Sequence, residues 1–235
     1  MENVNQVRAS RAIALPHAMG HEQTAWSMPA DRSRVLRNTY ALLSMTLLFS
    51  AAIAYASLVL KLPSPGLVLT LVGYFGLLFL VYKLQNSAGG IFAVFGLTGF
   101  MGYTLGPVLA HSLALPGGSQ TIMLALLATG SSFVGLSAWV LTTKRDFSFM
   151  GGFLFAGMIV ALLAGLGAVF FQVPALALAV SAMVALLSVG LILFETSQIV
   201  NGGQTNYVLA TVGLYVSVFN LFTSLLSLLG FNSDS

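Results

Sequence analysis

Long apolar runs, separated by short polar segments, make up most of the chain after residue 37. The runs are continuously apolar and show no alternation of period two, so they favour helices over a β-barrel. The shortest run, at residues 66–82, reaches roughly 26 Å as a helix, against a hydrocarbon core of about 30 Å. We predict an all-α membrane protein whose seven transmembrane helices form a bundle and span residues 38–60, 66–82, 90–110, 121–142, 149–171, 174–199 and 206–230.

The basic residues between the runs predict how these helices are oriented in the membrane. If the N-terminus is cytosolic, the cytosolic side carries every Lys and Arg except Lys61. Such a bias is typical of segments that stay inside. We therefore expect residues 1–37, which are polar and broken by proline and glycine, to form a flexible cytosolic tail. The transmembrane domain then covers 38–230, and residues 231–235 form a short tail outside.

The composition excludes an ordinary soluble domain. Of the 235 residues, 57% are hydrophobic and 6% are charged, where a soluble domain carries about 25% charged residues. The net charge of +3 does not indicate nucleic-acid binding, because five of the nine basic residues lie in the tail, as expected of a topology signal. The absence of cysteine excludes a disulfide framework and a thiolate metal site.

Small residues recur at helix-packing spacing in the third predicted helix. Gly99, Gly102 and Gly106 are three and four residues apart, so they share one face and allow another helix to approach closely. A second interpretation is a hinge or a broken helix, which Gly106 followed by Pro107 could supply. Both interpretations remain open from the sequence.

The predicted helices lack side chains suited to catalysis. His17 and His21 are four residues apart in the tail, but no HExxH motif and no third ligand accompany them. No Asp or His lies at mid-depth, and no base is placed to activate a serine. We expect no catalytic residue, no bound metal and no cofactor, and hence a protein that is not an enzyme.

Glu195 is the only carboxylate within a predicted helix. An ionised carboxylate in hydrocarbon is costly unless it is paired, solvated or functional. In an antiparallel hairpin that turns at residues 202–203, Glu195 is expected to face roughly Thr211, with Ser217 and Asn220 deeper on the same polar stripe. Glu195 then either pairs structurally, with Lys83 as a partner at the same membrane side, or serves an ion or proton path.

Five segments in order resemble the Bax inhibitor-1 family of seven-span membrane proteins. They read GFMGYTLGPVLA at 99–110, ALLAT at 125–129, KRDFSFMGG at 144–152, LFETSQI at 193–199 and LYVSVFNLFTSLLSLLG at 214–230. The resemblance covers nearly all of residues 35–232. More narrowly, the chain resembles bacterial inner-membrane members of this family that bind and inhibit the membrane AAA protease FtsH. It therefore implies a multi-pass protein of the bacterial inner membrane with FtsH as partner and a tail, containing Arg8 and Arg11, that the protease can grip.

The same resemblance implies an alternative function, because some members are similar to pH-sensitive calcium leak channels. Carried over by position, the acidic residue of their sixth helix is Glu195, and the basic residue near the end of their second helix is Lys83. The aspartate of their seventh helix falls on Ser217. A Glu and a Ser cannot share a proton as two carboxylates do, and calcium has one charged ligand fewer. Glu195 with Asn220 could still bind calcium or protons weakly.

Overall fold

The computed structural model of the chain describes residues 30–231. Within this range seven long helices follow one another, and each is long and apolar enough to cross a membrane. They are connected by short turns, with one 3-10 turn, η1 (Ser148–Met150), before the fifth of them. The helices are α2 (Ala30–Val59), α3 (Gly66–Leu84), α4 (Ala88–Ala114), α5 (Gly118–Thr143), α6 (Gly151–Phe171), α7 (Pro174–Asn201) and α8 (Tyr207–Phe231).

The all-helical prediction is confirmed, and each predicted run coincides with one helix to within a few residues at its ends. The main difference is the start of α2, which begins at Ala30 and not near residue 38. Asp31 in its first turn favours this start, because a carboxylate stabilises the positive end of the helix dipole. Arg32, Arg34 and Arg37 are exposed on the same extension. Residues 30–37 are therefore helical, whereas Arg8 and Arg11 lie outside the described residues.

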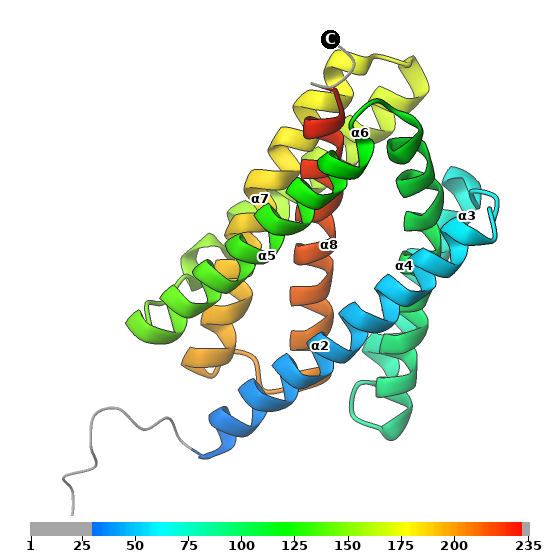
Figure 1. Cartoon of the computed structure of the whole chain (residues 1–235). Coiled ribbons are helices and arrows are strands. Elements are labelled where there is room, and N and C mark those ends of the chain that lie inside the picture. Colours follow the sequence, from blue (N-terminus) through cyan, green and yellow to red (C-terminus); the bar gives the residue numbers. More distant parts are fainter. Residues whose placement is uncertain (1–29, 232–235) are drawn as a thin grey trace, which may run out of the picture. The chain divides into compact units, whose positions relative to one another are not determined.

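Helix α8 lies in the middle of the bundle (Figure 1) and packs against α7, α5, α4 and α3. Tyr215 of α8 is 1% exposed. Its hydroxyl shares a hydrogen bond of 2.6 Å with the hydroxyl of Ser50 on α2 and donates to the carbonyl oxygen of Thr98 on α4 at 3.3 Å. Because nothing else in hydrocarbon would satisfy these groups, Tyr215 fixes α2 and α4 against the central helix.

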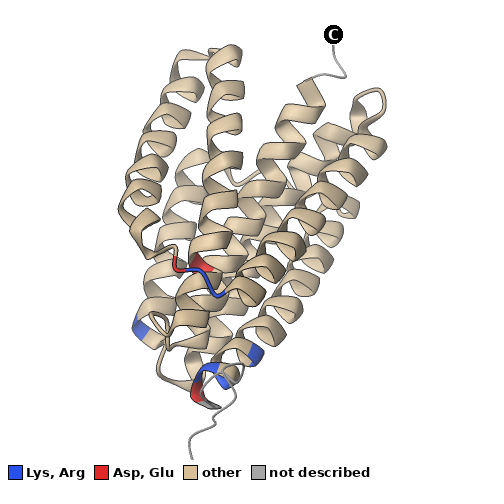
Figure 2. Ribbon diagram, turned by 90° about the vertical axis from the view of Figure 1, so that its left-hand side faces the viewer, with Lys and Arg blue, Asp and Glu red and all other residues tan. Residues whose placement is uncertain are grey.

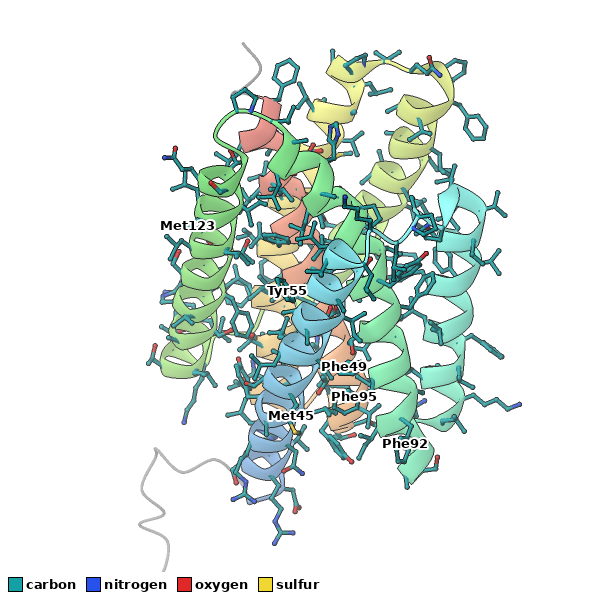
Figure 3. All side chains as sticks on the ribbon, turned by 45° about the vertical axis from the view of Figure 1, so that its right-hand side comes forward. Met45, Phe49, Tyr55, Phe92, Phe95 and Met123 are labelled. Atoms are coloured by element: carbon teal, nitrogen blue, oxygen red, sulfur yellow. The ribbon has the colours of Figure 1, made fainter. Side chains whose placement is uncertain are left out.

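Gly99, Gly102 and Gly106 of α4 face α2. A side chain at Gly99 would meet the ring of Phe49, one at Gly102 would overlap the carbonyl oxygen of Ser50, and one at Gly106 would overlap the Ser57 hydroxyl. Phe49 also packs edge-on against Phe95, with 5.3 Å between ring centroids (Figure 3). The missing side chains let the two backbones approach, as in other membrane helix pairs. Helix α4 is not interrupted at Pro107 and continues to Ala114.

Two helices have few neighbours. Helix α3 packs on α4 and touches α8, and α6 packs on α7 and η1, but α3 and α6 do not contact each other. Only Val81 is fully buried in α3. Large apolar side chains such as Phe79 and Phe153 are exposed on these helices, as expected where the surrounding solvent is lipid. The Lys and Arg segments visible in Figure 2 lie in the lower half of the bundle in that view.

Candidate functional site

Glu195 lies on α7, six residues before the helix ends at Asn201. Its carboxyl group packs directly on the backbone of Gly213 in α8: a Cβ at Gly213 would be 2.5 Å from the carboxyl carbon. The missing side chain of Gly213 therefore creates the space that the carboxyl group occupies. Among the described residues, Glu195 has no hydrogen bond and no ion pair. An unpaired carboxyl group at a helix–helix contact is unusual in a membrane and marks a candidate site.

Ser217 lies one helical turn beyond Gly213 and is 2% exposed. Its hydroxyl donates to the carbonyl oxygen of Gly213 at 2.9 Å. Glu195 and Ser217 thus meet the same glycine, one through its Cα and the other through its carbonyl. The expected partner Thr211 does not face Glu195, because its hydroxyl donates to the carbonyls of Tyr207 and of Thr39 on α2.

Lys83 and Asn220 lie away from this contact. Lys83 is exposed in the last turn of α3 and forms no ion pair with Glu195, so the expected structural pairing is absent. A long basic side chain at a helix end can reach the interface, where its charge stays hydrated. Asn220 lines a cavity bounded by α3, α6, α7 and α8. The structure therefore brings Glu195 and Ser217 to one glycine, whereas Lys83 forms no pair with Glu195 and Asn220 lines a cavity that Glu195 does not line.

A cluster of polar side chains at the end of α7 holds the α5–α6 loop and was not predicted from the sequence. The hydroxyl of Ser197 accepts from the N–H of Phe147 at 2.9 Å and donates to the carbonyl of Arg145 at 3.2 Å. Asn201 donates to the same carbonyl, and the Gln198 amide donates to the Ser148 hydroxyl. The only sequence signal was the polar spacing that follows Glu195, which does not say what the side chains hold.

Two further contacts shape this end of the bundle. The loop residue Asp146 accepts hydrogen bonds from the hydroxyl of Ser148 at 2.5 Å and its N–H at 2.8 Å, and these bonds lower the pKa of the Asp146 carboxyl. At the end of α7, Gly202 has a positive φ of 82° and forms the C-cap, at the turn predicted for residues 202–203. The guanidinium of Arg32 lies against Gly202, where a cation is favoured by the helix dipole.

The described residues contain no group of three His, Cys, Asp or Glu side chains that could hold a metal ion. Glu195 is the only carboxylate within the helices described, apart from Asp31 at the start of α2. A calcium ion, which usually takes six to eight oxygen ligands, would need carbonyl and hydroxyl oxygens or water for nearly all of them.

The sequence matches a family of membrane proteins and several bacterial relatives. Residues 32–234 match the family described as inhibitor of apoptosis-promoting Bax1. The chain is 56% identical over 200 residues to the modulator of FtsH protease YccA of Escherichia coli, covering 85% of this chain and 91% of that protein. The same identity and coverage hold for the inner membrane protein YccA of a second Escherichia coli strain.

An uncharacterized protein of Pseudomonas aeruginosa is 52% identical over 198 residues, covering 84% of this chain and 89% of that protein. An uncharacterized membrane protein of Vibrio cholerae is 45% identical over 206 residues, covering 87% and 92%. None of these relatives is named as an enzyme. The structure has seven helices able to cross a membrane, and one relative is named as an inner membrane protein. Both observations give the same location: the chain is a multi-pass protein of the bacterial inner membrane.

Proposed function

This chain belongs to the Bax inhibitor-1 family, and we propose that it binds the membrane protease FtsH and inhibits it in membrane-protein quality control. The observation that carries this proposal is the 56% identity to the modulator of FtsH protease over 91% of that protein. The role is one of binding and not of catalysis.

The proposal includes an orientation, with the N-terminus in the cytosol and the C-terminus in the periplasm. In this orientation the end of α7 with the loop at residues 144–150 faces the cytosol, and so does the segment at residues 1–29. An AAA protease extracts membrane proteins by pulling on an exposed cytosolic segment, and residues 1–29, with Arg8 and Arg11, would supply one. Because α2 begins at Ala30, a deletion that leaves every described helix intact ends at residue 29.

The direct test measures FtsH activity in proteoliposomes on a fluorescent membrane-protein substrate, with and without the purified chain. We expect degradation to slow as the chain is added, and we expect the chain to co-purify with FtsH from detergent. The matched control is an unrelated seven-helix protein at the same lipid ratio, which should leave the rate unchanged. Equal rates with both proteins, together with no co-purification, would refute the proposal.

The segment at residues 1–29 is tested separately in cells by following the lifetime of the full chain and of the chain without these residues. We expect the deletion to lengthen the lifetime where FtsH is present and to have no effect where FtsH is depleted. A lifetime that is the same for both chains in the presence of FtsH would show that FtsH does not extract the chain by pulling on this segment.

A second function, a pH-sensitive cation leak, is favoured by one observation: the carboxyl group of Glu195 has no partner among the described residues at the α7–α8 contact. Protonation of such a group changes the charge between two helices, which could alter their packing. Calcium and proton flux through liposomes is compared for the wild type and Glu195→Gln across about pH 5 to 8. If the chain forms a leak, the flux through the wild type should depend on pH, and Glu195→Gln should abolish the flux or make it independent of pH. Flux equal to that of empty liposomes at every pH would reject the leak.

A further inference from the structure

A cavity of about 490 Å³ lies between α3, α6, α7 and α8. It separates α3 from α6, two helices that do not contact each other. Its outer wall is formed by exposed side chains such as Phe155 (69% exposed) and Val169 (59%). Its inner wall includes Ala161, which is buried (3% exposed). The cavity therefore opens sideways, towards the lipid, and not only towards the aqueous ends of the bundle.

The wall of the cavity is almost entirely apolar, with two exceptions. Tyr74 of α3 and Asn220 of α8 both line it. Neither side chain has a hydrogen-bond partner among the residues that the structure describes, although the backbone carbonyl of Asn220 accepts from Thr223. An amide and a hydroxyl without partners in a membrane forfeit several kcal/mol between them relative to water. A molecule that offers them an oxygen acceptor would recover part of this cost.

The size of the cavity decides between occupants. A transmembrane helix about 10 Å wide and 30 Å long has a volume of about 2,400 Å³, which is well beyond what the cavity offers. Small-molecule sites range over roughly 300–1,000 Å³, and this cavity lies within that range. Water is disfavoured because each molecule needs two to four polar partners, and waters filling the cavity would find only two polar side chains. The occupant is therefore a small, mostly apolar molecule.

The depth of the two polar groups decides which kind of molecule. Tyr74 is one residue from residue 75, the midpoint of α3 (Gly66–Leu84), and Asn220 is one residue from 219, the midpoint of α8 (Tyr207–Phe231). The ester and phosphate oxygens of a phospholipid lie about 15 Å away, at the edges of the hydrocarbon core. An acyl chain that entered the cavity would bring no acceptor to Tyr74 or Asn220.

We propose that the cavity between α3 and α6 binds a lipid-soluble carbonyl compound of the quinone type, with its ring oxygens accepting hydrogen bonds from Tyr74 and Asn220 and its apolar tail leaving towards the lipid. Such a molecule carries its carbonyl oxygens into the middle of the membrane on a compact ring. The aromatic side chains of Phe75 and Phe155, which also line the cavity, suit a flat ring. The site is separate from Glu195 and does not depend on the binding of FtsH.

The test uses decylubiquinone as the probe and decylbenzene, which has a similar ring and tail but no oxygen, as the matched probe. The full chain is placed in nanodiscs that contain one of the two, and the fraction that retains the probe is measured by native mass spectrometry. We expect decylubiquinone to be retained and decylbenzene to be retained at least fivefold less, since one lost hydrogen bond of about 1 kcal/mol corresponds to about fivefold.

Variants Tyr74→Phe and Asn220→Leu each remove one donor group, Tyr74→Phe by deleting the hydroxyl and Asn220→Leu by replacing the amide with an apolar group of the same branching, and each should weaken binding of decylubiquinone by about fivefold. The control is Thr129→Val, which alters a second cavity between α2, α4, α5 and α8 and should have no effect. Tyr74→Phe is conservative enough to fold, which is checked by its unfolding temperature. Equal retention of both probes, or unchanged retention in both variants, would show that the cavity holds only hydrocarbon and would overturn the proposal.

Discussion

The carboxyl group of Glu195 lies on the Cα of Gly213, at the place where the side chain of any other residue would be. Helix α7 therefore approaches α8 closely enough to hold a carboxyl group between them only because residue 213 is a glycine. The carboxyl group occupies this space without a hydrogen bond from another described residue. Its position is set by the shape of the contact and not by a charged partner.

Gly213→Ala should force the carboxyl group of Glu195 out of this space. A Cβ would lie 2.5 Å from the carboxyl carbon, and overpacking of this kind costs about 1–3 kcal/mol. We expect the free energy of unfolding in mixed detergent micelles to fall by this amount. The matched control is Gly76→Ala on α3, where a Cβ meets nothing within 4 Å and the change should be small.

A double-mutant cycle separates shape from charge at the same contact. In a Glu195→Ala background Gly213→Ala should cost little, because the clashing atoms are gone, whereas in a Glu195→Gln background the cost should remain, because Gln has the same shape without the charge. If the cost disappears in both backgrounds, the carboxylate charge determines the contact and the packing explanation is wrong.

The position of Gly213 also shows how far sequence reasoning could go. The helices follow from apolar runs, since backbone groups in hydrocarbon must bond within their own segment, and the turn at Gly202 follows from its sequence. The rotation of α8 about its axis does not follow from the sequence, because it depends on packing. At about 100° per residue, Thr211 and Gly213, which are two residues apart, point in directions that differ by about 200°. The expected partner therefore lies on the opposite face, towards α2.

Other differences have similar causes. The extension of α2 to Ala30 was missed because a hydropathy pattern ends with the apolar residues, while a helix can continue into water where its charged side chains are exposed. The hydrogen bonds between Ser197 and the α5–α6 loop were not predicted, because they depend on the path of a loop fifty residues earlier in the chain. Backbone-directed hydrogen bonds of this kind leave no sequence pattern.

Ser197→Ala should loosen the α5–α6 loop. The Ser197 hydroxyl accepts from the N–H of Phe147 and donates to the carbonyl of Arg145, and losing a bond of about 1 kcal/mol speeds local opening about fivefold. Hydrogen exchange at the amide of Phe147 should rise by this factor. Ser131→Ala, which removes a hydroxyl bonded only to its own helix, is the control. Unchanged exchange at Phe147 would mean that the loop is held by other contacts.

The order of the same loop should be lost in acid. The hydrogen bonds from Ser148 lower the pKa of Asp146, so the ionised carboxylate is favoured in the folded loop. A lowered folded pKa gives a contribution that is complete above the unfolded pKa of about 3.9 and is lost as pH falls through the folded pKa. Protection of the Ser148 amide, corrected for the intrinsic exchange rate, should be constant from about pH 7 to 5 and fall only below about 4.

Asp146→Asn provides the control for this pH dependence, because the amide keeps an oxygen acceptor but does not titrate in this range. Its protection should be independent of pH over the same interval, while Asp31→Asn, at the start of α2, should behave as the wild type at Ser148. Loss of protection in the wild type near neutral pH would contradict the assignment of the transition to Asp146.

The proposed orientation can be measured with single cysteines, because the chain contains none of its own. Ala88 at the start of α4 and Ser119 at the start of α5 are exposed and lie at opposite ends of the bundle. With the N-terminus in the cytosol, Ala88→Cys should react with a membrane-impermeant maleimide only in inverted vesicles, and Ser119→Cys only in intact spheroplasts. The opposite pattern would place the end of α7 and the loop at residues 144–150 in the periplasm. They would then be out of reach of the cytosolic domain of an AAA protease, so this one experiment limits which surface of the protein the protease can contact.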